Sequence, residues 1–195
     1  MVLNNVHLEK AKKEDIIDIS NLIYETEMHP EYEWGNGSES EMRKRLIEML
    51  KAKDNRFALD NIIVCKEGES FVGILLSAEG KKIKSLTFKS DIKLLPMQCN
   101  LIEKIKYAVF NILGTYLFYK ECNRDEYYLS NIAVKPEYRG KGYGALLMEV
   151  GENVAREKGY KKVSLNANNE KLVKLYEKFG FNLEEGSNMK MVKRI

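Results

Sequence analysis

Residues 132–144 have the sequence Ile132-Ala-Val-Lys-Pro-Glu-Tyr-Arg-Gly-Lys-Gly-Tyr-Gly144. The aromatic and β-branched residues that end at Val134 predict a strand, and the apolar spacing after the last glycine predicts a helix. Backbone N–H groups in the first turn of a helix are unpaired and lie at its positive end, and glycines let a bulky anion approach them closely. The stretch therefore predicts a loop that binds a phosphate or pyrophosphate, with Arg139 and Lys141 adding positive charge.

The spacing of the glycines separates this loop from two common phosphate-binding motifs. A P-loop has Ser or Thr directly after its Gly-Lys pair, whereas Gly142 follows Lys141 here. A dinucleotide fingerprint has the pattern Gly-x-Gly-x-x-Gly, whereas Gly140, Gly142 and Gly144 occupy alternate positions. On these residues alone, a strand-to-helix turn with purely structural glycines remains the alternative.

A second motif follows at residues 169–181, with the sequence Asn169-Glu-Lys-Leu-Val-Lys-Leu-Tyr-Glu-Lys-Phe-Gly-Phe181. The two stretches resemble the two signatures of the GNAT superfamily of N-acetyltransferases, which are Arg/Gln-x-x-Gly-x-Gly/Ala and Asn-x-x-Ala-x-x-Leu-Tyr-x-x-x-Gly-Phe. Leu172 stands where the family usually has alanine. The resemblance is strong over residues 127–183, and the order of the expected elements extends it back to Val6.

The resemblance implies an acyl-CoA-dependent acetyltransferase with acetyl-CoA as its donor substrate and no metal. It implies that strand residues 132–134 pair their backbone with the pantetheine arm, and that the loop donates backbone N–H groups to the pyrophosphate. It also implies that Asn169 bonds the pantetheine or phosphate region. The donor-binding residues expected on this basis are Ile132, Ala133, Val134, Arg139, Gly140, Lys141, Gly142, Tyr143, Gly144, Asn169 and Tyr176.

The mechanism implied by the resemblance is direct attack of a neutral amine on the acetyl carbonyl in a ternary complex. The backbone N–H near Ile132 would polarise the carbonyl oxygen, in the manner of an oxyanion hole. Tyr176 is expected to be the general acid toward the departing thiolate, with core packing as the alternative role. The general base stays open: Glu126 acting through water, Tyr128 and a water chain are the candidates. Glu126 is equally well explained as a solvated charge at the end of a strand.

The whole chain has 195 residues, of which 44% are hydrophobic and 31% charged, as expected for a single globular domain over residues 1–195. Apolar periodicity predicts helices at 16–27, 38–51, from the glycine loop to Gly159, and at 170–179. It predicts strands at 6–10, 61–66, 70–77, 127–134, 162–167, 181–183 and 189–192. This order indicates a mixed α/β fold, and the resemblance implies a largely antiparallel central sheet flanked by helices.

Two segments lie outside this regular pattern. Residues 28–38 are expected to form a loop, which ends in a capping box where Ser38 is followed three residues later by Glu41. Residues 78–125 are expected to be a helical insertion, because apolar residues recur at helical spacing over 101–113. The insertion is expected either to pack against the main body or to form an oligomer contact, as in a homodimer.

The cysteines and the charge balance exclude several classes of protein. The three cysteines, at positions 65, 99 and 122, form no Cys-x-x-Cys pair, and the two histidines lie far apart. A zinc site or disulfide framework is therefore not expected, and free thiols are typical of the cytoplasm. The N-terminus lacks signal-peptide features, and the longest uncharged stretch, 107–119, is short of the roughly 20 residues of a membrane helix. With a net charge of +3, we expect a soluble cytoplasmic protein with neither membrane nor nucleic-acid partners.

The charges are unevenly distributed along the chain. Residues 1–40 hold nine acidic and three basic side chains, whereas residues 135–195 hold eight acidic and thirteen basic ones. The acidic stretch Glu25–Glu41 contains Tyr32 and Trp34 and corresponds to the segment that walls the acceptor site in the family. Carboxylates beside aromatic rings attract cations, so the expected acceptor is a cationic small molecule such as a polyamine, an aminoglycoside or an amino-acid derivative. The alternatives are a merely solvated acidic loop, a peptide or protein N-acetyltransferase, and a non-catalytic acyl-CoA sensor.

Overall fold

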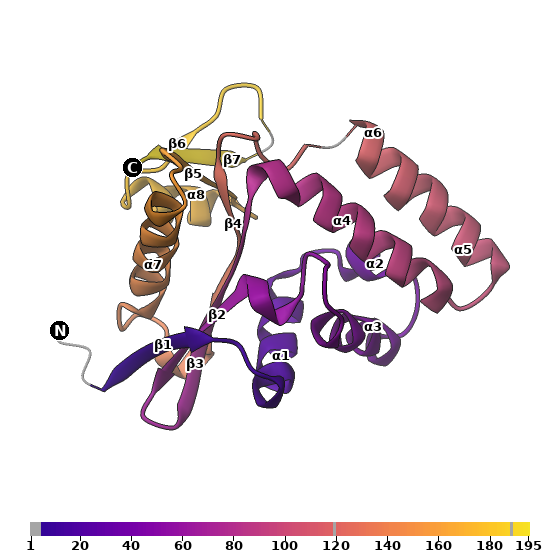
Figure 1. The fold of residues 1–195 in the computed structure, drawn as a ribbon, viewed down its shortest axis with the longest axis horizontal. Helices are drawn as coiled ribbons and strands as arrows, with labels where there is room; N and C mark the ends of the chain where they lie inside the picture. Colours follow the sequence, from indigo (N-terminus) through magenta and orange to yellow (C-terminus); the bar gives the residue numbers. More distant parts are fainter. Residues whose placement is uncertain (1–4, 119, 188) are drawn as a thin grey trace. The chain divides into compact units, whose positions relative to one another are not determined.

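The computed structural model describes residues 5–118, 120–187 and 189–195 (Figure 1). The chain divides into two compact units that are built from alternating segments. The first unit holds the N-terminal segment up to Glu9, Ile63–Ile83 and Glu121–Ile195, and the second holds Lys10–Ile62 and Lys84–Lys120. Neither unit is a continuous stretch of sequence. The single domain expected from composition stays a prediction.

The first unit is built on a seven-stranded sheet with the order β1-β2-β3-β4-β5-β7-β6. The pairs β3–β4, β5–β7 and β6–β7 are antiparallel, and β4–β5 is parallel. The prediction of a mixed, largely antiparallel sheet flanked by helices is therefore confirmed. The strands are β1 (Val6–Lys10), β2 (Ile62–Glu67), β3 (Ser70–Glu79), β4 (Tyr127–Val134), β5 (Lys162–Asn166), β6 (Asn182–Leu183) and β7 (Lys190–Arg194).

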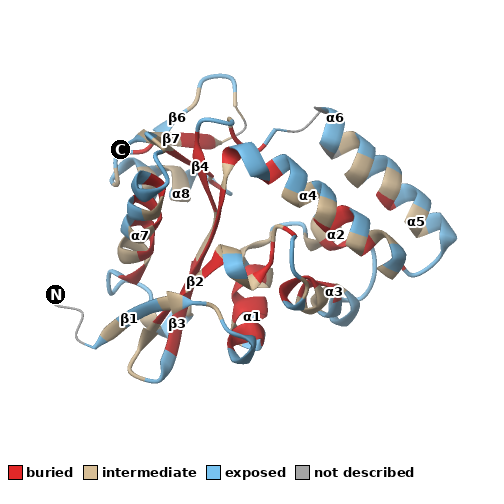
Figure 2. Ribbon diagram, in the orientation of Figure 1, coloured by how far each residue is buried: buried red, intermediate tan, exposed pale blue. Residues whose placement is uncertain are grey.

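Two helices belong to this unit, α7 (Tyr143–Glu157) and α8 (Glu170–Glu177). Helix α7 packs against β3, β4 and β5, and α8 contacts β6. The approach of α7 to the sheet is close, because a Cβ atom added to Gly151 would lie 2.7 Å from Leu129 Cδ2. Figure 2 shows the buried residues along β4 and along one face of α7. The core between them includes Leu75, Leu129, Tyr143, Leu147, Met148, Val163, Leu165, Phe181 and Met191.

The second unit is helical. Its elements are α1 (Ile16–Thr26), α2 (Pro30–Trp34), α3 (Glu39–Lys51), most of α4 (Gly80–Leu94), α5 (Leu101–Tyr107), the π-helix η4 (Ala108–Thr115) and α6 (Tyr116–Phe118). The predicted capping box is confirmed: Glu41 N donates to Ser38 Oγ, and Ser38 N donates to the Glu41 carboxylate. The largest buried side chains of this unit include Ile19, Ile23, Trp34, Leu46, Leu50 and Phe57. Short 3-10 turns at Lys13–Asp15, Leu59–Asn61, Leu95–Met97 and, in the first unit, Pro136–Tyr138 complete the elements.

The structure corrects the sequence prediction at two helices. The stretch 28–38 is not entirely a loop. Pro30, at the first helical position, begins the one-turn helix α2, and the side chain of Trp34 is buried at the end of this helix. Within the insertion that was expected to be helical, apolar spacing located a helix only over 101–113, and the structure adds helix α4, whose sequence is rich in lysine and begins with Gly80. The start of this helix is set by tertiary contacts: Gly80 N donates to Glu126 O, and a Cβ at Gly80 would lie 2.1 Å from Asn123 O. Among the described residues, no helix combines the length and the hydropathy of a membrane-spanning segment.

Candidate active site

The glycine loop lies between β4 and α7, as its sequence predicts. Gly140 and Gly142 have positive φ values of 76° and 98°, which glycine adopts without steric cost. Gly142 is the N-cap of α7, and no side chain caps the first turn of that helix. The N–H groups of this turn therefore face outward at the positive end of a fifteen-residue helix.

The space above the loop is open. A Cβ atom added at Gly140, Gly142 or Gly144 would meet nothing within 4 Å. At Gly151 on the same helix, by contrast, an added Cβ atom would touch Leu129. The three loop glycines are thus not required for internal packing, and they leave the backbone accessible to a bulky group, which fits the pyrophosphate of a CoA thioester.

Strand β4 separates from β5 above this loop. The parallel pairing of the two strands involves Tyr127 with Val163 and Tyr128 with Ser164, whereas the pairing of β4 with β3 continues to Val134. Between β3 and β4 the register shifts, so that Ser130 is an extra residue on β4 and forms a β-bulge. Beyond Tyr128, alternate backbone groups of β4 therefore point toward the gap on the β5 side, and the residues expected to contact pantetheine, 132–134, lie in this part.

Three of the loop residues expected at the donor site have side chains that make contacts within the protein. Arg139 Nε donates to Val134 O at 2.9 Å, and Lys141 Nζ lies 5.1 Å from the ring centroid of Tyr138. Tyr143 is buried, packs edge-on against Tyr138, and donates its hydroxyl to Glu67. The N–H of Arg139 also has an internal partner, since it donates to Pro136 O at 3.2 Å. The open space beside Gly140, Gly142 and Gly144 therefore makes the backbone of residues 140–144 the part of the loop best placed for anion binding.

Asn169 and Tyr176 lie at the start and near the end of α8. The Asn169 side chain accepts a hydrogen bond from Leu172 N at 3.0 Å and so caps the helix. Tyr176 is half-buried, and its ring centroid lies 6.1 Å from that of Phe181. Burial raises the pKa of the Tyr176 phenol, which keeps the hydroxyl protonated, as a proton donor must be.

Glu126 is not a solvated charge at the start of β4, because only 1% of it is exposed. Its carboxylate accepts from Asn123 N at 2.8 Å and forms an ion pair with Lys190 Nζ at 3.0 Å. Burial would raise the pKa of Glu126, but the hydrogen bonds from Asn123 and Lys190 outweigh it, so the pKa is lowered. A carboxylate held in this way is a weak base whose oxygens are already engaged. The geometry favours a structural role for Glu126.

The hydroxyl group of Tyr128, the other side chain considered as a general base, is also engaged in a hydrogen bond. It is buried on β4, and its hydroxyl oxygen accepts from Asn166 Nδ2 at 3.0 Å. This bond ties the two strands together just where their parallel pairing ends. Tyr128 therefore lies at the point where β4 and β5 part.

Comparison with known proteins assigns this arrangement to a family. The model of the acetyltransferase (GNAT) family matches residues 21–181. The chain belongs to the GNAT family. It is an acyl-CoA-dependent acetyltransferase, and the sequence resemblance on which its fold was predicted is confirmed.

Solved structures agree with this assignment. An N-acetyltransferase from Staphylococcus aureus Mu50 is 25% identical, with a TM-score of 0.69 over 95% of this chain and 97% of its own. A second structure, described as an acetyltransferase, is 21% identical, with a TM-score of 0.71 over 97% of this chain and 99% of its own. The PaiA N-acetyltransferase of Thermoplasma acidophilum, solved in complex with coenzyme A, shares the fold at 15% identity and a TM-score of 0.54, over 97% and 99% of the two chains. No curated protein sequence matches the chain.

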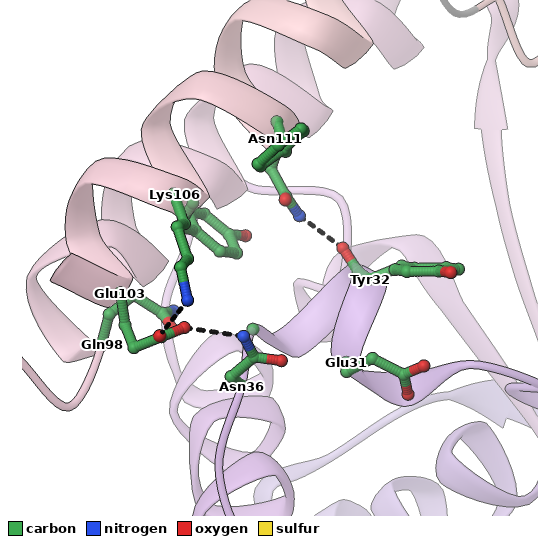
Figure 3. A pocket seen from close by; sticks show the side chains of 10 residues that line it. Glu31, Tyr32, Asn36, Gln98, Glu103, Lys106 and Asn111 are labelled. Atoms are coloured by element: carbon green, nitrogen blue, oxygen red, sulfur yellow. Dashed lines mark hydrogen bonds and ion pairs between the residues drawn. The ribbon is translucent and has the colours of Figure 1, made fainter.

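The acidic segment of this GNAT chain contributes to a pocket that lies wholly within the second unit. Trp34 does not contribute an aromatic face to it, because its side chain is fully buried against Phe57. Tyr32, by contrast, is 71% exposed and lines the pocket together with Glu31 (Figure 3). The volume is about 500 Å³, and the other lining residues are Gly35, Asn36, Gln98, Glu103, Lys106, Tyr107, Phe110 and Asn111.

The far wall of this pocket comes from the insertion, and sequence reasoning did not find it. Asn111 donates to the Tyr32 carbonyl, and Glu103 accepts from Asn36 at 2.7 Å and from Lys106 at 2.9 Å (Figure 3). Contacts between residues 67 to 79 positions apart in sequence build this wall. Such contacts leave no periodic or motif signal in a single sequence, so none could have revealed them.

Proposed function

We propose that the protein transfers an acetyl group from acetyl-CoA to the primary amine of a cationic small molecule, by direct attack in a ternary complex. The observation that carries the donor half is the separation of β4 from β5 above an open glycine loop at the start of α7. A neighbour at 25% identity is named an N-acetyltransferase, which supports nitrogen as the acceptor atom.

The donor is held mainly by backbone groups in this proposal. The N–H groups of residues 140–144 bind the pyrophosphate, because the N–H of Arg139 already donates to Pro136 O, and the edge of β4 at residues 132–134 that faces away from β3 binds the pantetheine amides. Asn169 contributes through the side-chain nitrogen that helix capping leaves available. Because the loop glycines are open to solvent, this mode of binding requires no rearrangement of the core.

The chemical step follows from the same geometry. The amine nitrogen forms a bond to the acetyl carbon, the carbonyl oxygen is stabilised by a backbone N–H near the bulge of β4, and the C–S bond then breaks. The thiolate takes its proton from Tyr176, the attacking nitrogen loses its proton to water, and the Tyr176 phenolate then regains a proton from solvent. We assign deprotonation to water because the carboxylate of Glu126 is buried and paired with Lys190.

The acceptor class rests on the pocket of the second unit. Its wall carries two carboxylates, Glu31 and Glu103, against one ammonium, Lys106, and it exposes the rings of Tyr32 and Phe110. Aromatic faces beside a net negative charge favour an organic cation over an anion or a neutral group. This balance supports an amine that carries at least one further positive charge.

The test is thiol release from acetyl-CoA in the presence of matched acceptors: a polyamine, an aminoglycoside, an uncharged monoamine and a basic peptide. We expect turnover with the first two and little with the monoamine. Glu31→Gln should raise KM for the cationic acceptor about fivefold, as expected for the loss of one exposed charge. Glu39→Gln, an exposed acidic residue outside the pocket, is the matched control and should leave KM unchanged.

The outcomes separate the two halves of the proposal. Thermal stabilisation by acetyl-CoA without thiol release from any amine would identify a sensor rather than an enzyme. Turnover with the peptide but not with polyamines would keep the donor site and overturn the acceptor class. No stabilisation by acetyl-CoA would overturn the donor site itself.

A further inference from the structure

One face of the helical segment that runs from Leu101 to Phe118 carries large apolar side chains that remain exposed (Figure 2). Five of them are spaced four residues apart, and we call them the apolar stripe. They are Leu101, Ile105, Val109, Leu113 and Leu117, and they are 72, 56, 48, 55 and 64% exposed. A row of this kind is unusual on the surface of a protein that works alone.

The π-helix keeps these residues on one line. In an α-helix, residues four apart advance slightly beyond a full turn, because a turn takes 3.6 residues. In a π-helix the hydrogen bonds span five residues and the turn is wider, so residues four apart fall short of a full turn. The stripe begins in α5, passes through η4 and ends in α6. Its residues therefore rotate about the helix axis in one direction in the α-helical parts and in the opposite direction in the π-helix, and the two rotations largely cancel.

The opposite face of the same segment attaches it to the second unit. Tyr107 is buried, with its hydroxyl 3.0 Å from Asp91 Oδ1, and Asn111 donates to the Tyr32 carbonyl. These two residues lie about half a turn away from Ile105, Val109 and Leu113. The helix is therefore already held on its inner side, and the stripe is not required for packing within its own unit.

The exposed area is large enough for a stable interface. With the flanking Ile102 and Tyr116, which are 65 and 47% exposed, the apolar surface is on the order of 700 Å², taking somewhat under 200 Å² for each fully exposed side chain, the lower part of the range for large side chains. The largest patch on a typical monomer is about 300–600 Å². A standard protein–protein interface takes about 800 Å² from each partner.

The pattern of the stripe identifies the partner. The five positions are symmetric about Val109, so an antiparallel second copy would place Leu101 against Leu117 and Ile105 against Leu113. The members of each of these pairs have nearly equal exposure. Residues 107–118 contain no charged side chain, so no charge would be desolvated at the centre of such a contact.

We infer that the apolar stripe is the interface of a homodimer, in which the helical segments of two copies pack antiparallel around a two-fold axis at Val109. A two-fold interface uses the same patch on both copies, and a palindromic stripe meets that condition. An amphipathic helix that binds a membrane is rich in Lys and Arg on its polar face, whereas residues 101–118 hold only Lys104 and Lys106. One further lysine, Lys84 of α4, lies over the ring of Tyr116 at the edge of the surface, 4.4 Å from the ring centroid. The inference does not depend on the acceptor proposed above.

The test uses the position on the axis. Val109→Glu and Val109→Lys each place like charges against one another in a dimer, so each variant alone should sediment as a monomer. Mixed in equal amounts, the two should form a heterodimer, because opposite charges then meet at the axis. The wild-type chain should sediment as a dimer at micromolar concentration. Ile17→Glu, at an apolar position on α1 that is 60% exposed, is the matched control and should remain dimeric.

Circular dichroism melting of each variant establishes that it is folded. Should a charged variant fail to fold, Val109→Cys in a Cys99→Ser background, treated with an oxidant, should cross-link two copies, whereas Ile17→Cys in the same background should not. A monomeric wild-type chain, or dimers that persist in both charged variants, would overturn the inference. Co-sedimentation of a monomeric wild-type chain with phosphatidylcholine–phosphatidylglycerol vesicles would also overturn it and assign the stripe to a membrane surface.

Discussion

Tyr176 is the residue on which the chemistry of the proposal depends most directly. Burial raises its pKa above the ordinary value of about 10. The phenol is therefore protonated throughout the neutral and mildly alkaline range, and it is able to donate to a thiolate. Near the end of α8, its ring packs against that of Phe181.

We predict that Tyr176→Phe lowers kcat about 100-fold, within the usual range for loss of a general acid, and leaves KM for acetyl-CoA nearly unchanged. Because the raised pKa keeps the acid protonated, the wild-type kcat should not fall through this group below about pH 10. Steady-state assays from pH 6 to pH 10 measure both effects. Tyr160→Phe, another hydroxyl removal in the same unit, is the control; an unchanged kcat in Tyr176→Phe with chemistry rate-limiting would remove Tyr176 from the mechanism.

Glu126, unlike Tyr176, has surroundings that do not fit a catalytic role, because its carboxylate forms a buried ion pair with Lys190. We predict that Glu126→Gln lowers the free energy of unfolding at pH 7 by about 3 kcal/mol, the lower end for breaking a buried pair. The value is at the lower end because Lys190 keeps Glu184 as a second partner at 2.9 Å. Activity per folded molecule should remain within a factor of about three, since the proposed proton acceptor is water.

The sign of the pH dependence follows from the lowered pKa of Glu126. The contribution of the carboxylate is complete above its unfolded pKa of about 4.3 and is lost as the pH falls through the lower folded value. The difference between wild type and Glu126→Gln should therefore shrink below about pH 4. Urea unfolding of both proteins at pH 7 and pH 3.5 measures this difference in the free energy of unfolding. A tenfold fall in kcat with unchanged stability would instead place Glu126 on the proton path.

At the level of elements, helix α7 is flanked at both termini by a glycine with a positive φ. Gly142 at its start has φ of 98°, Gly159 just beyond its end has φ of 80°, and a Cβ at either would meet nothing within 4 Å. The two positions thus share the same strain and the same free space. They differ in that the space at Gly142 is the proposed pyrophosphate site.

We predict that Gly142→Ala and Gly159→Ala each lower the free energy of unfolding by about 1–2 kcal/mol, the cost of a left-handed conformation for an alanine. Gly142→Ala alone should raise KM for acetyl-CoA, about tenfold, because its methyl group projects into the space above the loop. Thermal melts and donor titrations of both variants measure the two effects. Equal KM values for the two variants would show that this end of α7 does not hold the donor.

At the level of the whole molecule, the small net charge hides two opposite distributions. The first forty residues carry an acidic surplus of six, whereas residues 41–134 and 135–195 carry basic surpluses of four and five. The proposed acceptor pocket uses acidic residues of the first forty, and the donor loop lies within residues 135–195. An anionic donor and a cationic acceptor are thus each attracted to a region of opposite charge.

We predict that KM for acetyl-CoA and KM for a cationic acceptor both rise severalfold between 20 mM and 500 mM salt, as screening shortens the Debye length from about 20 Å to about 4 Å. The turnover number should change little, because the reacting groups are brought together by binding rather than by long-range attraction. An uncharged amine of similar size is the control. A KM for acetyl-CoA that does not depend on salt would show that the charge of the loop does not contribute to donor binding.

The amino-acid sequence by itself determined the parts of the protein that rest on short-range signals. The strand, glycine loop and helix of residues 127–157 follow from local propensity, from proline after Lys135 and from glycine at positive φ. The capping box at Ser38 and the second motif at 169–181 are equally local. For this reason the family and the local structure of the proposed donor loop were predictable.

Only the tertiary structure decided the environment of individual side chains. Glu126 meets Lys190 across 64 positions of sequence, and this contact turns an expected solvated charge or base into a buried ion pair. Trp34 becomes core, Tyr32 stays exposed, and α4 begins where Gly80 fits against Asn123. The physical reason is that burial, desolvation and ion pairing depend on which distant segments meet, whereas periodicity reports only which face of an element is apolar.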